Sequence, residues 1–207
     1  MKAHLFYILL GYLSGSVLYA MLIPRLFLGV DVTKDSEDHN PGTFNVFDQC
    51  GVVAGIAVLV CELLKAFLPV YIASRRVSME SAWFVLVLAA PVIGHVFPIF
   101  FHFQGGKGIA AAFGALLGLI PYLMPALLLA GAYVFFSVFV RIETHLWRSV
   151  ATFAAFALLM CRYCPIASLR RGSVVVGAGV ALKHLRKYQG DAFSMTVPLL
   201  QRLKRAQ

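Results

Sequence analysis

Charged side chains are scarce in this sequence, and acidic ones especially so. Of 207 residues, nine are Asp or Glu, and all charged residues together make up 13% of the chain. A soluble globular domain is usually about one quarter charged, so the composition excludes that class. Hydrophobic residues account for 60% of the chain, and its mean hydropathy is +0.83. The sequence therefore predicts an all-α integral membrane protein.

Cysteine is also rare, with four residues at positions 50, 61, 161 and 164. Cys161 and Cys164 have the spacing of a redox or zinc pair, but neither a second such pair nor a pair of histidines accompanies them. We therefore expect these cysteines to be small residues within or beside membrane spans, and we expect no metal site.

Basic residues outnumber acidic ones by 18 to nine, which gives a net charge of +9. They form no single stripe of the kind that nucleic acid would require. Instead they stand at the ends of apolar segments, where they favour anionic lipid headgroups and fix topology. We expect membrane lipids as partners and no nucleic acid.

The apolar segments predict about seven transmembrane helices, with six as the alternative count. A span needs about 20 apolar residues. The stretch 109–140 is too long for one crossing, and Pro121 and Pro125 predict a turn that divides it. We see no internal repeat and expect one membrane domain over residues 1–207. The expected spans are 4–28, 50–74, 81–101, two within 109–140, 149–161 or a turn longer at each end, and a short one from 173 that continues to about 188.

Seven spans place the two termini on opposite sides of the membrane. With the N-terminus outside and the C-terminus in the cytoplasm, eleven basic residues lie inside and six outside, as the positive-inside rule favours. The same topology brings three polar clusters to the cytoplasmic face. These are residues 31–48, residues 104–108, and residues 141–148 together with the stretch from position 183.

Residues 103–108, Phe-Gln-Gly-Gly-Lys-Gly, form the most informative segment and are called the glycine loop below. Glycine N–H groups can surround an anion, the following helix adds its positive end, and Lys107 adds a full charge. The segment does not follow the Walker A pattern, because Phe101 stands where its first glycine belongs. A phosphate or acyl phosphate would suit it; the alternative is a flexible turn with a snorkelling lysine.

Glu62, Lys65 and His95 are ionisable residues in the interior of expected spans. His95, in Gly-His-Val-Phe-Pro, stands just before the glycine loop and could handle a proton or contact a phosphate. The alternative is a buried histidine that donates to a backbone carbonyl. Glu62 and Lys65 are three residues apart on one helical face, and we expect a structural ion pair with an electrostatic role behind it.

Two further segments have ordinary structural readings when each is taken alone. Residues 40–45, Asn-Pro-Gly-Thr-Phe-Asn, combine turn residues with two carboxamides and a hydroxyl, so they predict a turn. Gly15 and Ser16, within the first span, indicate a close helix-packing site.

Taken in order, these segments resemble the bacterial acyl-phosphate:glycerol-3-phosphate acyltransferases, the PlsY family. Gly11–Ser16 matches the family's G-Y-L-x-G-S opening, and Asn40–Asn45 matches part of its G-S-G-N-x-G-A-T-N loop. Glu62 and Lys65 stand in its D-x-x-K-G pattern. Gly94–Pro98 and the glycine loop match G-H-x-F-P and F-x-G-G-K-G fully. Order and spacing agree over about the first 110 residues.

The resemblance implies a seven-span enzyme of the bacterial inner membrane, active at the cytoplasmic face. It would transfer a fatty acyl group from acyl phosphate to the 1-hydroxyl of glycerol 3-phosphate, without metal or cofactor, because the donor carries its own leaving group. Lys107 and His95 are then the catalytic candidates. The candidates for substrate binding are Ser16, Asn40, Gly42, Thr43, Asn45, Gly105, Gly106, Gly108, Arg141, Lys183 and His184.

This chain departs from the family pattern at several positions. Residues 37–39, Glu-Asp-His, replace Gly-Ser-Gly, Asp48 replaces an arginine, and Ala111 replaces a threonine. The C-terminal motif survives only loosely in residues 183–191. Acidic replacements would repel a phosphate dianion unless they turn away or a cation intervenes. Lys34, His39, Lys183 and His184 could supply such charge, while a different phosphorylated acceptor, a small transporter and a non-catalytic scaffold are the alternatives.

Overall fold

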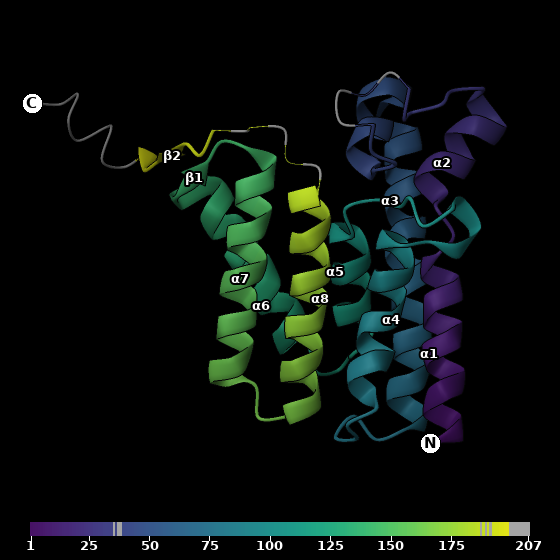
Figure 1. The fold of residues 1–207 in the computed structure, drawn as a ribbon, viewed down its shortest axis with the longest axis vertical. Coiled ribbons are helices and arrows are strands. Elements are labelled where there is room, and N and C mark those ends of the chain that lie inside the picture. Colours follow the sequence, from purple (N-terminus) through teal and green to yellow (C-terminus); the bar gives the residue numbers. More distant parts are fainter. Residues whose placement is uncertain (35, 37–38, 187, 189, 191, 199–207) are drawn as a thin grey trace, which may run out of the picture.

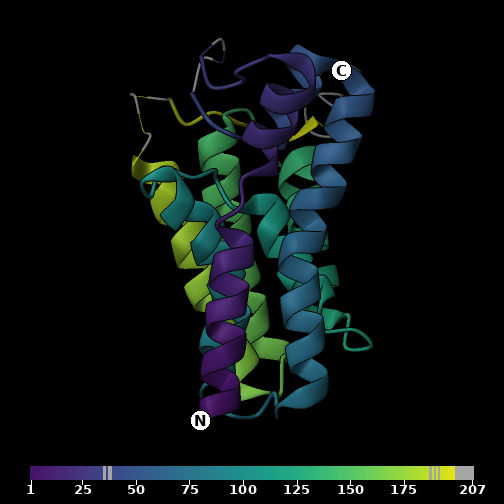
Figure 2. The ribbon, with the colours of Figure 1, turned by 90° about the vertical axis from the view of Figure 1, so that its right-hand side faces the viewer.

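The computed structural model of the chain is a bundle of upright helices (Figures 1 and 2). It describes residues 1–34, 36, 39–186, 188, 190 and 192–198. Met1 lies at one end of the bundle, called the lower end here, and the last helix finishes at the opposite, upper end. The upper end also carries the start of the longest helix and a two-stranded antiparallel sheet.

Within the described residues the chain forms eight α-helices, two π-helical segments, one 3-10 turn and two strands. The first half contains α1 (Lys2–Gly15), α2 (Tyr19–Ile23), the π segment Pro24–Leu28, α3 (Thr43–Arg76), α4 (Phe84–Val96) and the 3-10 turn Ile99–Phe101. The second half contains α5 (Ile109–Leu117), α6 (Met124–Val134), the π segment Phe135–Phe139, β1 (Arg141–Ile142), α7 (His145–Tyr163), α8 (Ala167–Arg186) and β2 (Met195–Thr196).

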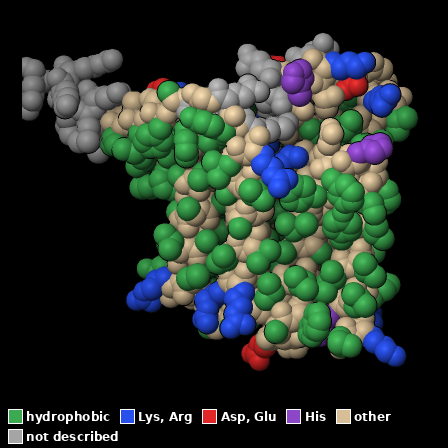
Figure 3. Space-filling model, in the orientation of Figure 1, with side chains coloured by type: hydrophobic (Ala, Val, Ile, Leu, Met, Phe, Trp, Pro, Cys, Tyr) green, Lys and Arg blue, Asp and Glu red, His purple; other side chains and the backbone are tan. Residues whose placement is uncertain are grey.

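The flank of the bundle is apolar, as the composition predicts. Three helical stretches, Lys2–Leu28, Thr43–Arg76 and Phe84–Phe101, are long and apolar enough to cross a membrane, and Met124–Phe139 is a shorter apolar helix. In Figure 3, hydrophobic side chains cover the visible flank, whereas lysine and arginine gather at the two ends. Such a surface suits a hydrocarbon environment.

The first expected span, 4–28, lies within the apolar helical stretch Lys2–Leu28, but this stretch is not one continuous helix. It breaks between α1 and α2, where Leu18 leaves the helical conformation with φ −96° and ψ 86°. Backbone groups exposed by such a break need partners inside a membrane. Side chains of α3 supply those partners, as described for the site below.

The second expected span also begins earlier than predicted. Helix α3 starts at Thr43 rather than Cys50, so residues 43–48 are helical and not part of the loop. Gly51, with φ +81° and ψ 177°, interrupts the helix near the predicted start and divides α3 into a short upper piece and a long lower one. A residue with a side chain would be strained at this φ.

The later boundaries follow the sequence more closely. The predicted turn between Pro121 and Pro125 is confirmed, because it separates α5 from α6. Helix α7 is longer at each end than the expected 149–161. Helix α8 begins six residues before the expected 173, so Arg170 and Arg171 lie inside it rather than ahead of it.

Close backbone approach holds the centre of the bundle together. A methyl group on Gly15 would overlap the backbone of Pro91, and one on Gly94 would overlap the Tyr12 carbonyl. The sequence prediction of a packing site at Gly15 is therefore confirmed, and it joins α1 to α4. This contact brings the break in the first helix beside His95 on α4.

Candidate functional site

Three ionisable side chains meet in the interior and are called the buried triad below. The Lys65 ammonium lies 2.6 Å from Oε2 of Glu62 and 2.9 Å from Nδ1 of His95. Nδ1 of His95 is 3.1 Å from the same Glu62 oxygen. All three residues are at most 5% exposed. The predicted Glu62–Lys65 ion pair is therefore confirmed, and the two charges compensate one another where water is excluded.

The buried triad also closes the break between α1 and α2. The Lys65 ammonium donates to the Val17 carbonyl at 2.5 Å, and Oε1 of Glu62 accepts from the Ala20 amide at 3.2 Å. The Ser14 hydroxyl in turn donates to the Lys65 carbonyl at 2.7 Å. Both broken helix ends thus find charged partners on α3. Glu62 and Lys65 cap a helix break, which differs from a transport pathway, where such residues line an open route.

His95 connects the buried triad to the glycine loop. Its carbonyl accepts from the Gly106 amide at 3.2 Å. A methyl group on Gly106 would overlap the His95 ring at Nε2, and one on Gly105 would overlap the His95 carbonyl. The loop therefore needs glycine at both positions to lie against His95. The interpretation of His95 as a histidine that donates to a backbone carbonyl is wrong, because Nδ1 contacts Lys65 and Glu62.

The glycine loop ends at the start of a helix, as an anion site requires. Gly108 has φ +86° and is the N-cap of α5. His102 and Phe103 also have left-handed φ values, 52° and 60°, so the chain turns sharply before the glycines. Lys107 is half-buried within this turn. Backbone N–H groups, a helix N-terminus and a lysine are thus gathered at one place, an arrangement that favours phosphate.

Residues 40–45 lie directly beside the glycine loop. The Asn40 carbonyl accepts from the Gly42 amide and from the Asn45 side chain, both at 2.8 Å. The turn ends at Gly42, the N-cap of α3. A methyl group on Gly106 would lie 3.0 Å from the Pro41 carbonyl, so the turn and the glycine loop are in close contact. The predicted turn is confirmed, while Thr43 and Asn45 occupy the first turn of the helix.

A cavity of about 750 Å³, called the polar cavity here, opens beside these two loops. Four of its lining residues, Lys34, His39, His102 and Lys183, are basic or imidazole side chains. None of the described lining residues is Asp or Glu, so the lining favours an anion. The described residues of the lining are Met21, Thr33, Lys34, His39, Pro41, Phe101, His102, Gln104, Gly105 and Lys183.

An acidic residue near this cavity is turned to its own loop. Oδ1 of Asp31 accepts from the Thr33 hydroxyl at 2.7 Å and from the Thr33 amide at 3.2 Å. The hydrogen bond from the Thr33 hydroxyl holds the pKa of the Asp31 carboxyl below its ordinary value, so this group is ionised at neutral pH. Glu37 and Asp38, which replace family residues, lie outside the described residues. Asp48 is exposed on α3 and does not line the polar cavity.

Of the remaining predicted binding residues, Lys183 lines the polar cavity, whereas Ser16, Arg141 and His184 do not. Lys183 reaches the cavity, and its ammonium donates to the Val96 carbonyl at 3.4 Å, while His184 is buried with Nδ1 2.9 Å from the Val180 carbonyl. Ser16 is fully buried at the helix break and accepts from the Ile99 amide at 3.4 Å. Arg141 is exposed on β1, paired with Thr196, and does not line the cavity.

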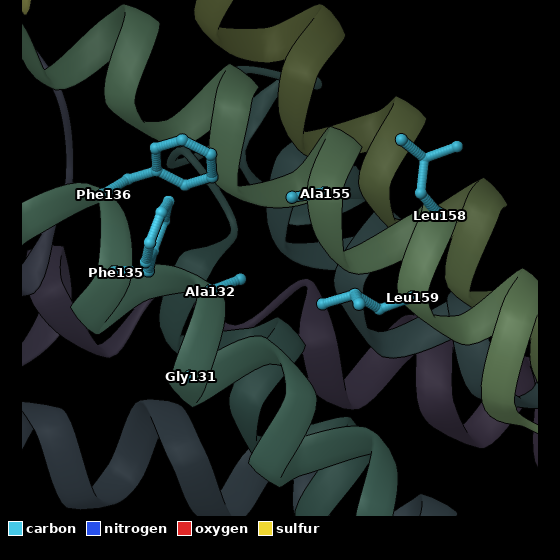
Figure 4. A pocket seen from close by; sticks show the side chains of 7 residues that line it. All are labelled: Gly131, Ala132, Phe135, Phe136, Ala155, Leu158 and Leu159. Carbon is cyan, nitrogen blue, oxygen red and sulfur yellow. The ribbon is translucent and has the colours of Figure 1, made fainter. Parts of the chain in front are cut away.

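A second cavity, of about 390 Å³, lies between α6 and α7 (Figure 4). Small and apolar residues line it, and Phe135, Phe136, Leu158 and Leu159 surround it in the close view. None of the described residues that line it is ionisable, so it lacks the groups that would bind an anion.

Sequence reasoning missed part of the lining of the polar cavity. Met21 carries no chemical signal in the sequence, and it enters the lining only because α2 folds over the same space as the two loops. His102 could have been noticed, because an imidazole one residue before the glycine loop is the kind of residue that contacts anions. The link between Lys65 and His95 spans 30 residues and has no spacing that the sequence could reveal.

Several known proteins are similar to this chain in sequence and in fold. The sequence profile of the family described as Glycerol-3-phosphate acyltransferase matches residues 5–190. A protein named glycerol-3-phosphate acyltransferase from Klebsiella pneumoniae is 44% identical over 109 residues, which are 53% of this chain and 52% of that protein. One of the same name from Shewanella woodyi is 44% identical over 127 residues, 61% of each chain. The matched regions thus span about half to three fifths of these relatives.

Solved structures extend the similarity to most of the bundle. The crystal structure of PlsY (YgiH), described as an integral membrane glycerol 3-phosphate acyltransferase in its glycerol 3-phosphate form, superimposes with a TM-score of 0.76. It is 27% identical, with 88% of each chain covered, and the lysophosphatidic acid form gives a TM-score of 0.71. With its profile match over residues 5–190, this chain belongs to the glycerol-3-phosphate acyltransferase family of integral membrane proteins.

Proposed function

We propose that this protein transfers a fatty acyl group from acyl phosphate to the 1-hydroxyl of glycerol 3-phosphate, giving lysophosphatidate and phosphate. The polar cavity carries the proposal, because it joins the glycine loop and Lys183 to two imidazoles in a lining without a described acid. Both substrates are anions, and such a lining would attract and orient them.

Different residues of the site would bind the donor and the acceptor of this reaction. The glycine loop and Lys107 would hold the phosphoryl group of the donor, since N–H groups and an ammonium stabilise charge on a departing phosphate. His95, whose ring lies against the loop, would contact the phosphoryl group or handle a proton. Asn40, the first turn of α3 and Lys183 would orient the acceptor, whose phosphate must lie apart from its reacting hydroxyl. No group on the protein needs to become acylated, because the donor is already activated.

We also propose that the chain crosses the bacterial inner membrane seven times as one domain, with its N-terminus outside. The seven crossings would be α1 with α2, then α3, α4, α5, α6, α7 and α8. The polar cavity would then face the cytoplasm, where water-soluble glycerol phosphate is available. The acyl chain of the donor would remain among the lipids beside the apolar flank.

The test is turnover by the purified protein in lipid nanodiscs. Acyl phosphate would be offered with a panel of polyol phosphates, and both released phosphate and the acylated product would be measured. We expect glycerol 3-phosphate to be acylated and glycerol to be inert, because the acceptor is recognised through its phosphate. Lys107→Ala, prepared identically, controls for contaminating activity.

A different phosphorylated acceptor is the second candidate. The observation that favours it is the pair of imidazoles, His39 and His102, in the lining of the polar cavity, since His39 stands where the family pattern has glycine. In the same panel, a polyol phosphate with a kcat/KM higher than that of glycerol 3-phosphate would support this candidate. Release of phosphate with no acceptor consumed, or no release at all, would contradict both.

A further inference from the structure

The Lys65 ammonium has three N–H groups and three close polar neighbours. These are the Val17 carbonyl at 2.5 Å, Oε2 of Glu62 at 2.6 Å and Nδ1 of His95 at 2.9 Å. An ammonium can only donate, so the atom of His95 that faces it must accept. Nδ1 therefore carries a lone pair, and the ring proton of a neutral imidazole must be on Nε2.

The geometry around Glu62 agrees with this assignment. Nδ1 of His95 lies 3.1 Å from Oε2 of Glu62. Among the described residues Oε2 accepts a well-directed hydrogen bond from neither Nδ1 nor the ammonium, so its contact with Lys65 is an ion pair and Nδ1 aims no proton at it. Glu62 thus compensates the charge of Lys65 and leaves the ring proton to the other nitrogen.

Nε2 faces the glycine loop. A methyl group on Gly106 would overlap Nε2, so this nitrogen lies against the loop's backbone. His95 is 5% exposed, and within the described part of the chain its ring bonds the protein only through Nδ1. Nε2 is not one of the described polar atoms that are both fully buried and without a partner, so it is accessible from the loop, where a ligand oxygen would give it an acceptor.

We propose that Lys65 fixes His95 as the neutral Nε2–H tautomer, so that the ring donates a hydrogen bond to the acyl phosphate bound at the glycine loop. This rests on the proposed acyl transfer. In that step the acceptor hydroxyl oxygen bonds to the acyl carbon, and the bond from that carbon to the phosphate oxygen breaks with its electron pair. The hydroxyl proton leaves with the phosphate. His95 keeps its own proton and stabilises oxygen charge, while Lys65 and Glu62 are positioning residues.

The tautomer is measured directly by nitrogen NMR of the protein labelled with ¹⁵N-histidine in lipid bilayers. The signals of His95 are identified by their loss in His95→Gln. We expect a neutral ring at pH 7 with a protonated Nε2 and an unprotonated Nδ1. A protonated Nδ1, in a neutral ring or in an imidazolium, would overturn the proposal. This measurement needs no substrate, so it stands apart from whether the protein turns over acyl phosphate.

Substitutions distinguish a donor from a base. A glutamine side chain can place an N–H near the position of Nε2 but cannot accept a proton. We expect His95→Gln to retain kcat within about tenfold, and His95→Ala to lose about 10²–10³-fold, as for loss of one preorganised donor. Equal loss in both, in folded protein, would show that His95 acts as a base.

The positioning role of Lys65 is tested by a double-mutant cycle. Lys65→Met should lower kcat in the native background, because Nδ1 can then take the proton and leave Nε2 bare. It should lower kcat much less in the His95→Gln background, which has no tautomer to lose. A purely structural role for Lys65 would cost the same in both backgrounds. Ser14→Ala removes a hydrogen bond at the same helix junction without touching the ammonium, and is the matched control.

Discussion

The neighbouring glycines Gly106 and Gly108 restrict the space around the Lys107 side chain. Gly106 on one side lies against His95, and Gly108 on the other has φ +86° and starts α5. The lysine is therefore held in a turn with little room, half-buried and next to a helix N-terminus. A compact ammonium on a flexible stem suits such a turn better than the planar fork of arginine.

Lys107→Ala is expected to lower kcat by at least about 10²-fold, because one charged contact to a departing phosphate contributes several kcal/mol in a site shielded from water. Lys107→Arg should restore little of this loss. Turnover in nanodiscs checks both variants, and a thermal unfolding scan shows that each is folded. An alanine variant with near-native kcat would remove Lys107 from the site.

Asp48 replaces an arginine of the family pattern, yet it is exposed on α3 and outside the lining of the polar cavity. Its influence on a bound phosphate would then be Coulombic and screened by salt. We expect Asp48→Arg to lower the KM for glycerol 3-phosphate about two- to fivefold at low ionic strength, with kcat unchanged. The effect should vanish at about 1 M salt, where the Debye length is about 3 Å. A change that persists at high salt would instead place position 48 in direct contact with the acceptor.

At the scale of helices, the sequence predicted positions well where a signal is local. The turn at Pro121–Pro125 and the close packing at Gly15 were both predicted from neighbouring residues. The break between α1 and α2 was not, since its partners Glu62 and Lys65 lie more than 40 residues away. An uninterrupted apolar run predicts a helix, and only tertiary hydrogen bonds allow it to open.

The same distinction applies to the candidate site. The glycine loop and His95 could be predicted, because each belongs to a short motif of adjacent residues whose types indicate the chemistry. The contact of Lys65 with His95 and the cation-lined cavity required the packing of α2, α4 and α8 around two loops. Arg141 is a case in which the sequence suggested a binding residue that the structure does not place in the cavity. Its charge is suitable, but it lies on β1, outside the lining of the polar cavity.

Helix packing gives a test that separates steric fit from helix propensity. Gly15→Ala places a methyl group into the Pro91 backbone, and Gly131→Ala on α6 meets nothing within 4 Å. We expect Gly15→Ala to reduce the free energy of unfolding by about 1–3 kcal/mol. Gly131→Ala should leave it unchanged or raise it by about 0.5–1 kcal/mol. Thermal unfolding in detergent measures both, and equal melting temperatures would mean that α1 and α4 can separate at little cost.

For the whole molecule, charge is distributed between the two ends of the bundle. Arg75 and Arg76 end α3 at the lower end, and Arg170 and Arg171 lie near the start of α8. Among the described residues, the upper end carries the basic residues of the glycine loop and the polar cavity. The seven crossings expected from the sequence assign eleven basic residues to the side of the membrane that holds the glycine loop and six to the other. The excess favours a cytoplasmic upper end.

Single cysteines in an otherwise cysteine-free variant test this orientation in intact cells. Gln104→Cys and Tyr188→Cys, both exposed at the upper end, should resist a membrane-impermeant maleimide until the cells are opened. Glu80→Cys, exposed in the turn between α3 and α4, should react from outside and serves as the matched control. The physical reason is the cost of translocating the larger group of positive charges across the membrane.

Labelling of positions 104 and 188 from outside, with position 80 protected, would show that the orientation is the reverse of the proposed one. The proposed path has one crossing, α4, between positions 80 and 104. If both positions reacted from the same side of the membrane, α4 would not cross it, and the seven-span path would be wrong.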